Sequence, residues 1–107
     1  MRIAWVGGLD RNEAALSRMA IRAGHRLDFH TGSVGGRGAG ELKAAIERSD
    51  LVIILTDVNS HGAVLLAKKI AQKLARPTLV LRRCGPTRFQ QLLDAIAARD
   101  ERLRVAS

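Results

Sequence analysis

Three side chains in this sequence can bind a transition metal, and they lie far apart along the chain: His30, His61 and Cys84. Imidazole and thiolate are ligands of zinc, iron, copper and haem iron, whereas hard cations prefer clustered carboxylates. The long, irregular spacing matches no zinc-finger pattern. A shared site therefore forms only if the fold brings these residues together. The remaining histidine, His25, is expected to be structural or exposed.

The sequence around two of these residues leaves two roles open for each. His61 falls in the first turn of a predicted helix, where the helix dipole disfavours a protonated ring and leaves the neutral imidazole free to bind. Arg82 and Arg83 precede Cys84 and a predicted helix follows it, so these charges would stabilise a thiolate. The alternatives are an exposed first-turn histidine and an inert, apolar cysteine.

Two glycine-rich segments suggest a second kind of chemistry, the binding of phosphate. Gly7 and Gly8 precede a predicted helix whose first amide groups can hold an anion. Residues 31–40 contain five glycines and Arg37, so backbone amides and a positive charge could cradle a phosphate. This segment lacks the ending of a P-loop, and a dinucleotide fingerprint would follow the first strand instead. A tight turn and a mobile loop without a ligand are the competing interpretations.

The order of apolar patterns predicts which elements position these residues. Short apolar runs alternate with segments in which apolar residues recur every three or four positions, as in amphipathic helices. The run at residues 51–55 is apolar without alternation, which is typical of a central parallel strand. Gly24 should end the first helix in a left-handed cap, and Pro86 suits the first turn of the last helix. The predicted strands are residues 3–6, 27–30, 51–56 and 78–81.

This alternation predicts an α/β fold, a three-layer, Rossmann-like or flavodoxin-like domain with a four-stranded parallel sheet and helices on both faces. We expect the first and third strands to be central, and a single domain over residues 1–107 in which residues 99–107 form a solvated tail or a small partner-binding extension. His30, His61 and Cys84 each end or follow a different strand. A parallel sheet would bring them to its carboxyl edge, where such folds bind ligands.

The composition narrows the classes of partner. Lys and Arg number 18 against 10 Asp and Glu, and the formal charge of +8 attracts polyanions. Trp5, Phe29 and Phe89 are the only aromatic residues, too few for the stacking platforms of single-strand binders. The single cysteine excludes an internal disulfide and fits a reducing compartment. No apolar run is long enough for a signal peptide or a bilayer span, so we expect a cytoplasmic protein outside the membrane.

Several motifs resemble those of the DUF2325 family of small bacterial α/β domains. They are the Gly7-Gly8 turn, His30-Thr31-Gly32 after the second strand, and Thr56-Asp57 with Asn59-Ser60-His61 after the third. The likeness covers nearly the whole chain. It implies a bacterial cytoplasmic protein in which His30 and His61 fall on the family's histidine positions, and it implies no particular activity. Cys84 departs from the small residue that the resemblance implies there.

Our leading hypothesis is a non-catalytic ligand-binding or sensing domain. It would hold a transition metal such as iron or zinc, or a haem, through His30 and His61 with help from Cys84. A homodimer could supply apolar walls and missing ligands. An enzyme with Cys84 as nucleophile and His61 as base would lack an acid partner and an oxyanion loop, so we expect no catalysis.

Two other functions remain open. One is a nucleotide-binding or phosphate-binding module that uses Gly7, Gly8 and Arg37. This hypothesis rests partly on the ligands that proteins with this fold commonly bind. The other is a nucleic-acid-binding regulatory protein with lysines on its helix faces, although such lysines also keep an outer face soluble. The lysines concerned are Lys68, Lys69 and Lys73.

Overall fold

Four short strands form one parallel sheet. The computed structural model describes the backbone of residues 1–106 and the side chains of residues 1–102. The strands run in the spatial order β2-β1-β3-β4, so β1 and β3 are central, as predicted. Their bounds are β1 (Arg2–Val6), β2 (Arg26–His30), β3 (Leu51–Leu55) and β4 (Thr78–Leu81). The helices are η1 (Asp10–Asn12), α1 (Glu13–Arg22), α2 (Gly38–Arg48), α3 (His61–Lys73) and α4 (Pro86–Ala106).

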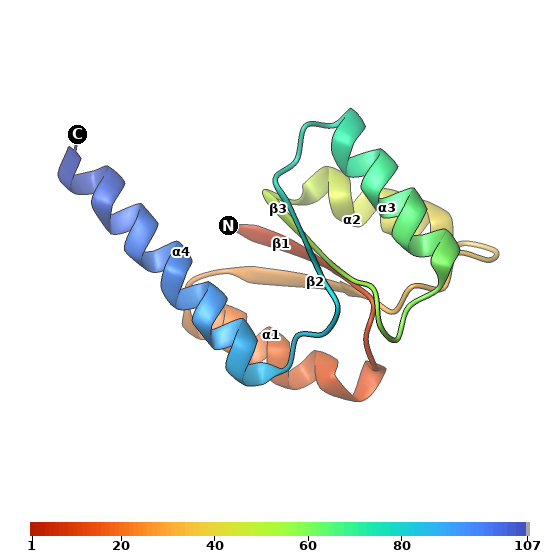
Figure 1. Cartoon of the computed structure of the whole chain (residues 1–107), viewed down its shortest axis with the longest axis horizontal. Coiled ribbons are helices and arrows are strands. Elements are labelled where there is room, and N and C mark those ends of the chain that lie inside the picture. The colour runs from red at the N-terminus through yellow and green to blue at the C-terminus, as the bar shows by residue number, and fades with distance from the viewer. Residues whose placement is uncertain (107) are drawn as a thin grey trace.

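Helices cover both faces of the sheet, which confirms the three-layer α/β architecture. Figure 1 shows α1 and α4 on one side of the strands and α2 and α3 on the other. Alternate residues of β1 divide between the two cores: Ala4 and Val6 pack with α2 and α3, whereas Ile3 and Trp5 pack with α1 and α4. Because β3 is also covered on both faces, all its side chains can be apolar.

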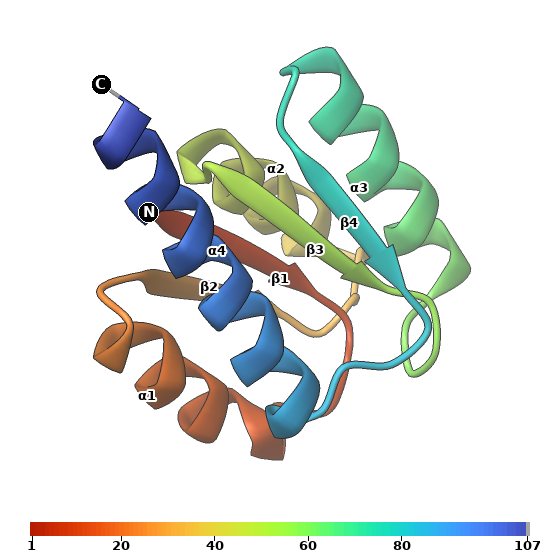
Figure 2. The same cartoon turned by 60° about the vertical axis from the view of Figure 1, so that its left-hand side comes forward.

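Aromatic packing fixes α4 to the sheet. The rings of Trp5 and Phe89 meet edge to face with their centroids 5.2 Å apart, and Phe29 stacks on the other side of Trp5 at 6.4 Å. Phe89 and Leu93 of α4 are both fully buried here. The far end of α4 extends past the sheet (Figure 2). All three aromatic residues of the chain thus lie in this core cluster or pack against it.

Two helix boundaries differ from the sequence prediction. The glycine-rich segment was expected to reach residue 40, but α2 begins at Gly38, because the chain already turns where the Gly38 amide donates to the Gly35 carbonyl. Residues 99–106, expected as a loose tail, continue α4. Their charged side chains gave little apolar periodicity, although Arg and Glu are good helix formers. Residue 107 lies outside the described residues. Along residues 1–106, no helix is both long and apolar enough to span a membrane.

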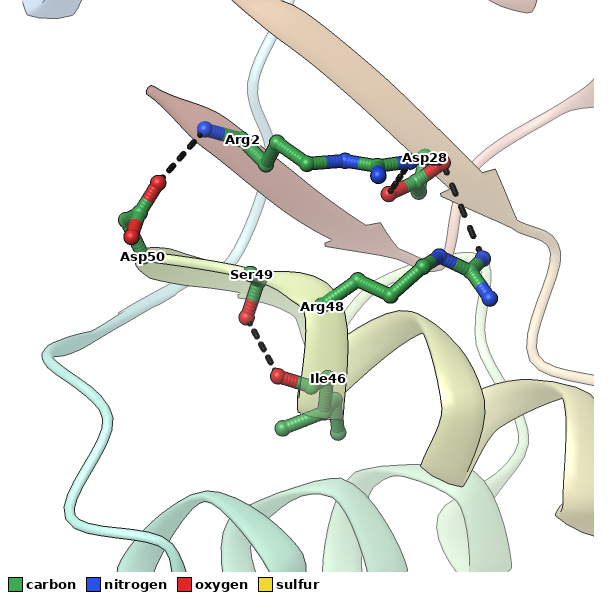
Figure 3. A network of polar contacts seen from close by, with 6 residues as sticks. All are labelled: Arg2, Asp28, Ile46, Arg48, Ser49 and Asp50. Carbon is green, nitrogen blue, oxygen red and sulfur yellow. Dashed lines mark hydrogen bonds and ion pairs between the residues drawn. The ribbon is translucent and has the colours of Figure 1, made fainter.

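Charged side chains are paired at the amino edge of the sheet. Asp50, just before β3, accepts a hydrogen bond of 2.8 Å from the backbone amide of Arg2 (Figure 3). The Arg2 guanidinium lies 3.3 Å from Asp28 of β2, and that of Arg48 lies 3.8 Å from the same carboxylate. The starts of β1 and β3 are thereby held by carboxylates that also balance nearby arginines.

The packing of Phe89 yields a prediction on stability. Phe89→Ala removes a buried ring from the interface between α4 and β1, and should lower the free energy of unfolding by about 3–5 kcal/mol. Urea denaturation followed by the fluorescence of Trp5, the single tryptophan, measures the loss. Ile21→Ala, at a side chain that is 66% exposed, is the control and should change stability by less than about 0.5 kcal/mol. Equal losses in both variants would contradict this account of the core.

Candidate functional site

Asn59 joins the two central strands at the carboxyl edge. Its side-chain amide donates to the carbonyl of Leu55, at 2.7 Å, and to that of Val6, at 3.3 Å. These two carbonyls end β3 and β1, whose following helices, α3 and α1, lie on opposite faces of the sheet. Open α/β sheets ordinarily bind ligands in the crevice at this point. Here the crevice contains the Asn59 side chain.

Ser60 connects the loop after β3 to the loop after β2. Its hydroxyl donates to the Gly32 carbonyl at 2.6 Å and accepts from the Ala63 amide at 3.0 Å, so Ser60 caps α3. Gly32 has a φ of +101°, and a Cβ atom there would overlap Oδ1 of Asn59. This close approach requires glycine at residue 32. Three loops are thus packed into one assembly.

The amides of the Gly7-Gly8 turn are engaged by the backbone. Gly7 donates to the carbonyl of His30 at 2.7 Å, and Gly8 donates to that of Val58 at 2.8 Å. Both glycines have positive φ, +108° and +88°, which the tight turn requires. In this structure neither amide is available to an anion. The geometry therefore favours the interpretation of these residues as a structural turn.

His30 is buried, and both of its ring nitrogens are hydrogen-bonded. Nδ1 accepts from the Gly32 amide at 3.0 Å, and Nε2 lies 2.9 Å from the carbonyl of Gly38, to which it donates. This pattern fits the neutral tautomer that carries its proton on Nε2. The ring connects the end of β2 to the start of α2. Binding a metal through either nitrogen would first break one of these bonds.

His61 differs from His30 because its ring is exposed. It is the first residue of α3 and follows Ser60, which bonds to Gly32 of the β2 loop. Within the part of the chain whose side chains are described, the His61 ring makes no hydrogen bond or ion pair. The carboxyl edge thus brings the loops of His30 and His61 together, as predicted, and leaves only His61 with free ring nitrogens.

Cys84 lies away from His30. It follows β4, which is three strand positions from β2, a span of roughly 14 Å at the usual strand spacing. Its side chain packs with Trp5 and Phe89 on the face covered by α1 and α4, whereas His30 bonds to α2 on the other face. Along residues 1–102, no three His, Cys, Asp or Glu side chains group in a way that could hold a metal ion.

The environment of Cys84 favours one of the two roles that the sequence left open. These were a thiolate stabilised by Arg82, Arg83 and a helix start, and an inert, apolar cysteine. Burial raises the pKa of the Cys84 thiol. The positive charge of Arg88 lowers the same pKa and so offsets part of this effect. Arg83 is turned toward Asp57, with Nε 2.8 Å from the carboxylate. Partial burial therefore outweighs the nearby cations.

Arg37 lies in a hollow of mixed charge beside the end of β2. The hollow has a volume of about 380 Å³, and Thr31 and Ser33 line it together with Asp10, Glu13, Glu41 and Arg37. Three carboxylates against one guanidinium oppose the binding of a phosphate. The phosphate cradle predicted for this loop thus lacks the net positive charge that it would need.

Two residues important at this edge were not singled out from the sequence. The contact of Asn59 with β1 depends on a residue 53 positions away in the sequence. For Arg88, the available signal was its position in the first turn of a helix that follows Arg82 and Arg83.

The Asn59 contacts predict a loss of stability. Asn59→Ala leaves the carbonyls of Val6 and Leu55 without this donor and should lower the free energy of unfolding by about 2–3 kcal/mol. The control is Asn12→Ala, because Asn12 is exposed and its side chain does not cap α1. Denaturant unfolding measures both variants. A loss no larger than that of Asn12→Ala would mean that Asn59 does not hold the central strands.

The raised pKa of Cys84 predicts slow alkylation at neutral pH. A raised pKa lowers the fraction of thiolate, so iodoacetamide should react more slowly with Cys84 than with glutathione at pH 7, and the rate should rise as the pH passes 9. Arg88→Gln should slow the reaction further, while Arg99→Gln, which removes the same charge farther along α4, should not. A rate at pH 7 above that of glutathione would show a stabilised thiolate after all.

Comparison with known proteins agrees with this arrangement of motifs. The family described as "Uncharacterized protein conserved in bacteria (DUF2325)" matches residues 2–96. No curated protein and no solved structure matches the chain. The matched range contains all four strands and the loops that Asn59 and Ser60 join. The chain therefore belongs to the DUF2325 family.

Proposed function

We propose that this chain is a non-catalytic haem-binding module, with His61 as the axial ligand and a second copy of the chain completing the site. The observation that carries the proposal is the set of exposed side chains around His61. An imidazole with free nitrogens stands one turn before the exposed apolar side chain of Leu65, and lysines follow along the same helix face. This combination matches the three chemical parts of a haem: iron, apolar macrocycle and propionates.

The exposed face of α3 provides this set in order. His61, Leu65 and Lys68 occupy positions i, i+4 and i+7, so they share one side of the helix. Leu65 is 55% exposed. A large apolar side chain with this exposure is a candidate for contact with a porphyrin. Lys68 and the adjacent Lys69 can pair with propionate carboxylates.

The geometry favours a haem over a bare iron or zinc ion. A protein usually supplies three or four ligands to a chelated ion, and His30, His61 and Cys84 are not grouped for that. A porphyrin supplies four nitrogens itself, so the protein needs to provide only one or two axial ligands. His61 meets this smaller requirement without disturbing the hydrogen bonds of His30.

A homodimer would provide what one chain lacks. A single helix face can cover only one side of a flat macrocycle. Two copies related by a twofold axis would place two His61 rings and two Leu65 side chains on opposite sides of the same haem. The site proposed here therefore lies between copies, with α3 as the contact element.

The other two hypotheses receive less support from the geometry. The phosphate site at Gly7, Gly8 and Arg37 would need amides that are engaged and a charge balance that is unfavourable. Lys68 and Lys69 are exposed, as a nucleic-acid contact would require, but a solvated helix face has the same appearance. No structural detail distinguishes the nucleic-acid hypothesis from that simpler interpretation.

Titration with haemin tests the proposed function. Wild-type protein should shift and sharpen the Soret band, bind half as many haems as chains, and change from monomer to dimer in sedimentation. His61→Ala should abolish the Soret shift because it removes the axial ligand. His25→Ala, which alters a histidine at the amino edge beside Met1, should bind haemin like the wild type.

Two outcomes would reject this function. One is the absence of a Soret shift with wild-type protein, and the other is a shift that persists in full in His61→Ala. Leu65→Asp separates the roles of the ligand and the apolar wall. It should weaken haemin binding and prevent dimerisation while circular dichroism shows an unchanged fold, because Leu65 is exposed in the single chain.

A further inference from the structure

A second concentration of chemistry lies at the end of β4, away from His61. An open hollow of about 710 Å³ is lined by Leu81, Arg82, Arg83, Gly85 and Arg88. Three of its five lining residues are arginines, and they come from the end of β4 and the first turn of α4. Planar guanidinium groups bind phosphate through paired N–H donors.

The positive charge of this hollow is only partly balanced. Asp57 accepts a hydrogen bond of 2.8 Å from Arg83, which orients that guanidinium. The same bond, with the charges of Arg82 and Arg83, holds the pKa of Asp57 below its ordinary value. Among the described side chains, Arg82 and Arg88 form no ion pair with a carboxylate. Two uncompensated cations therefore face the hollow from two different elements.

The direction of α4 adds to this potential. The helix begins at Pro86, at the rim of the hollow, and its first turn contains no acidic residue. The amino end of a helix carries partial positive charge that favours an anion. At the end of β2, by contrast, three carboxylates line the hollow that contains Arg37. The carboxyl edge of the sheet is thus positive at β4 and acidic at β2.

The arginine hollow continues into a second one along the edge. This second hollow has a volume of about 330 Å³ and shares Arg82, Arg83 and Gly85 with the first. It extends toward the exposed apolar side chains of Leu9 and Val58. A ligand that fits both hollows has a charged group at one end and an organic, partly apolar body at the other.

We propose that Arg82, Arg83 and Arg88 form a binding site for the terminal phosphate of a small phosphorylated molecule, whose organic part lies over Leu9 and Val58. The site is separate from the phosphate cradle that the glycine-rich segments predicted. It does not depend on haem. A phosphate monoester suits it better than a nucleic acid, because the cations surround one hollow and do not extend in a row along a helix or groove.

Isothermal titration of the wild-type chain with inorganic phosphate and with phenyl phosphate tests the site. Both should bind, and phenyl phosphate should bind more tightly because its ring adds apolar contact. Arg88→Gln should weaken both by about tenfold, the effect expected for one charge-assisted hydrogen bond. Arg99→Gln, which removes the same charge elsewhere on α4, should leave both affinities unchanged. Phosphate should also slow the alkylation of Cys84, which lies beside the hollow.

Three results would overturn the proposal. The first is that neither phosphate binds, and the second is that Arg88→Gln and Arg99→Gln weaken phosphate binding equally. The third is that duplex DNA binds more tightly as it becomes longer while phenyl phosphate fails to compete with it. The last result would assign the arginines to a nucleic-acid backbone, whose binding falls steeply as salt rises. His61→Ala should bind phosphate normally, so the failure of the haem proposal would not affect this one.

Discussion

The side-chain amide of Asn59 is the contact on which the carboxyl edge of this domain depends. It bonds the ends of β1 and β3 at once, and the loops of Gly7, Gly32 and Ser60 are packed around it. Any ligand site at this edge must therefore lie outside the central crevice. Along the described part of the chain, the edge remains open at the exposed face of α3, at the arginine hollow beside β4 and at the hollow of mixed charge beside β2.

Polar groups at the two edges of the sheet have different kinds of partner. At the amino edge, arginines meet carboxylates and the charges largely cancel. At the carboxyl edge, neutral side chains and backbone amides connect the loops after β1, β2 and β3, and Arg83 pairs with Asp57. Arg82 and Arg88 have no carboxylate partner among the described side chains. His30 belongs to the connecting network, and His61 does not. The two histidines share a strand edge, yet only one of them is chemically free.

Much of the fold could be predicted from the sequence, because it depends on local patterns. The apolar run of β3, the left-handed Gly24 and the place of Pro86 in the first turn of α4 are each encoded within a few residues, and the structure confirms them. The site was harder to predict. Topology placed the carboxyl ends of the strands at one edge, but it could not show that Cys84 packs on the opposite face from His30, or that Gly38 and Gly32 occupy the nitrogens of His30. Nor could it show that burial outweighs the arginines around Cys84.

The position of β4 has a consequence for how copies of this protein meet. Its outer side pairs with no strand of the described chain, and Val80 is exposed there. A free strand edge can recruit a second copy and extend the sheet without limit. β4 is only four residues long, and Arg82 and Arg83 follow it directly. If strands from many copies paired in one continuous sheet, these positive charges would lie close together and repel one another. Repulsion between these charges opposes polymerisation through β4. Contacts between helix faces are then the way in which copies can form an assembly of limited size.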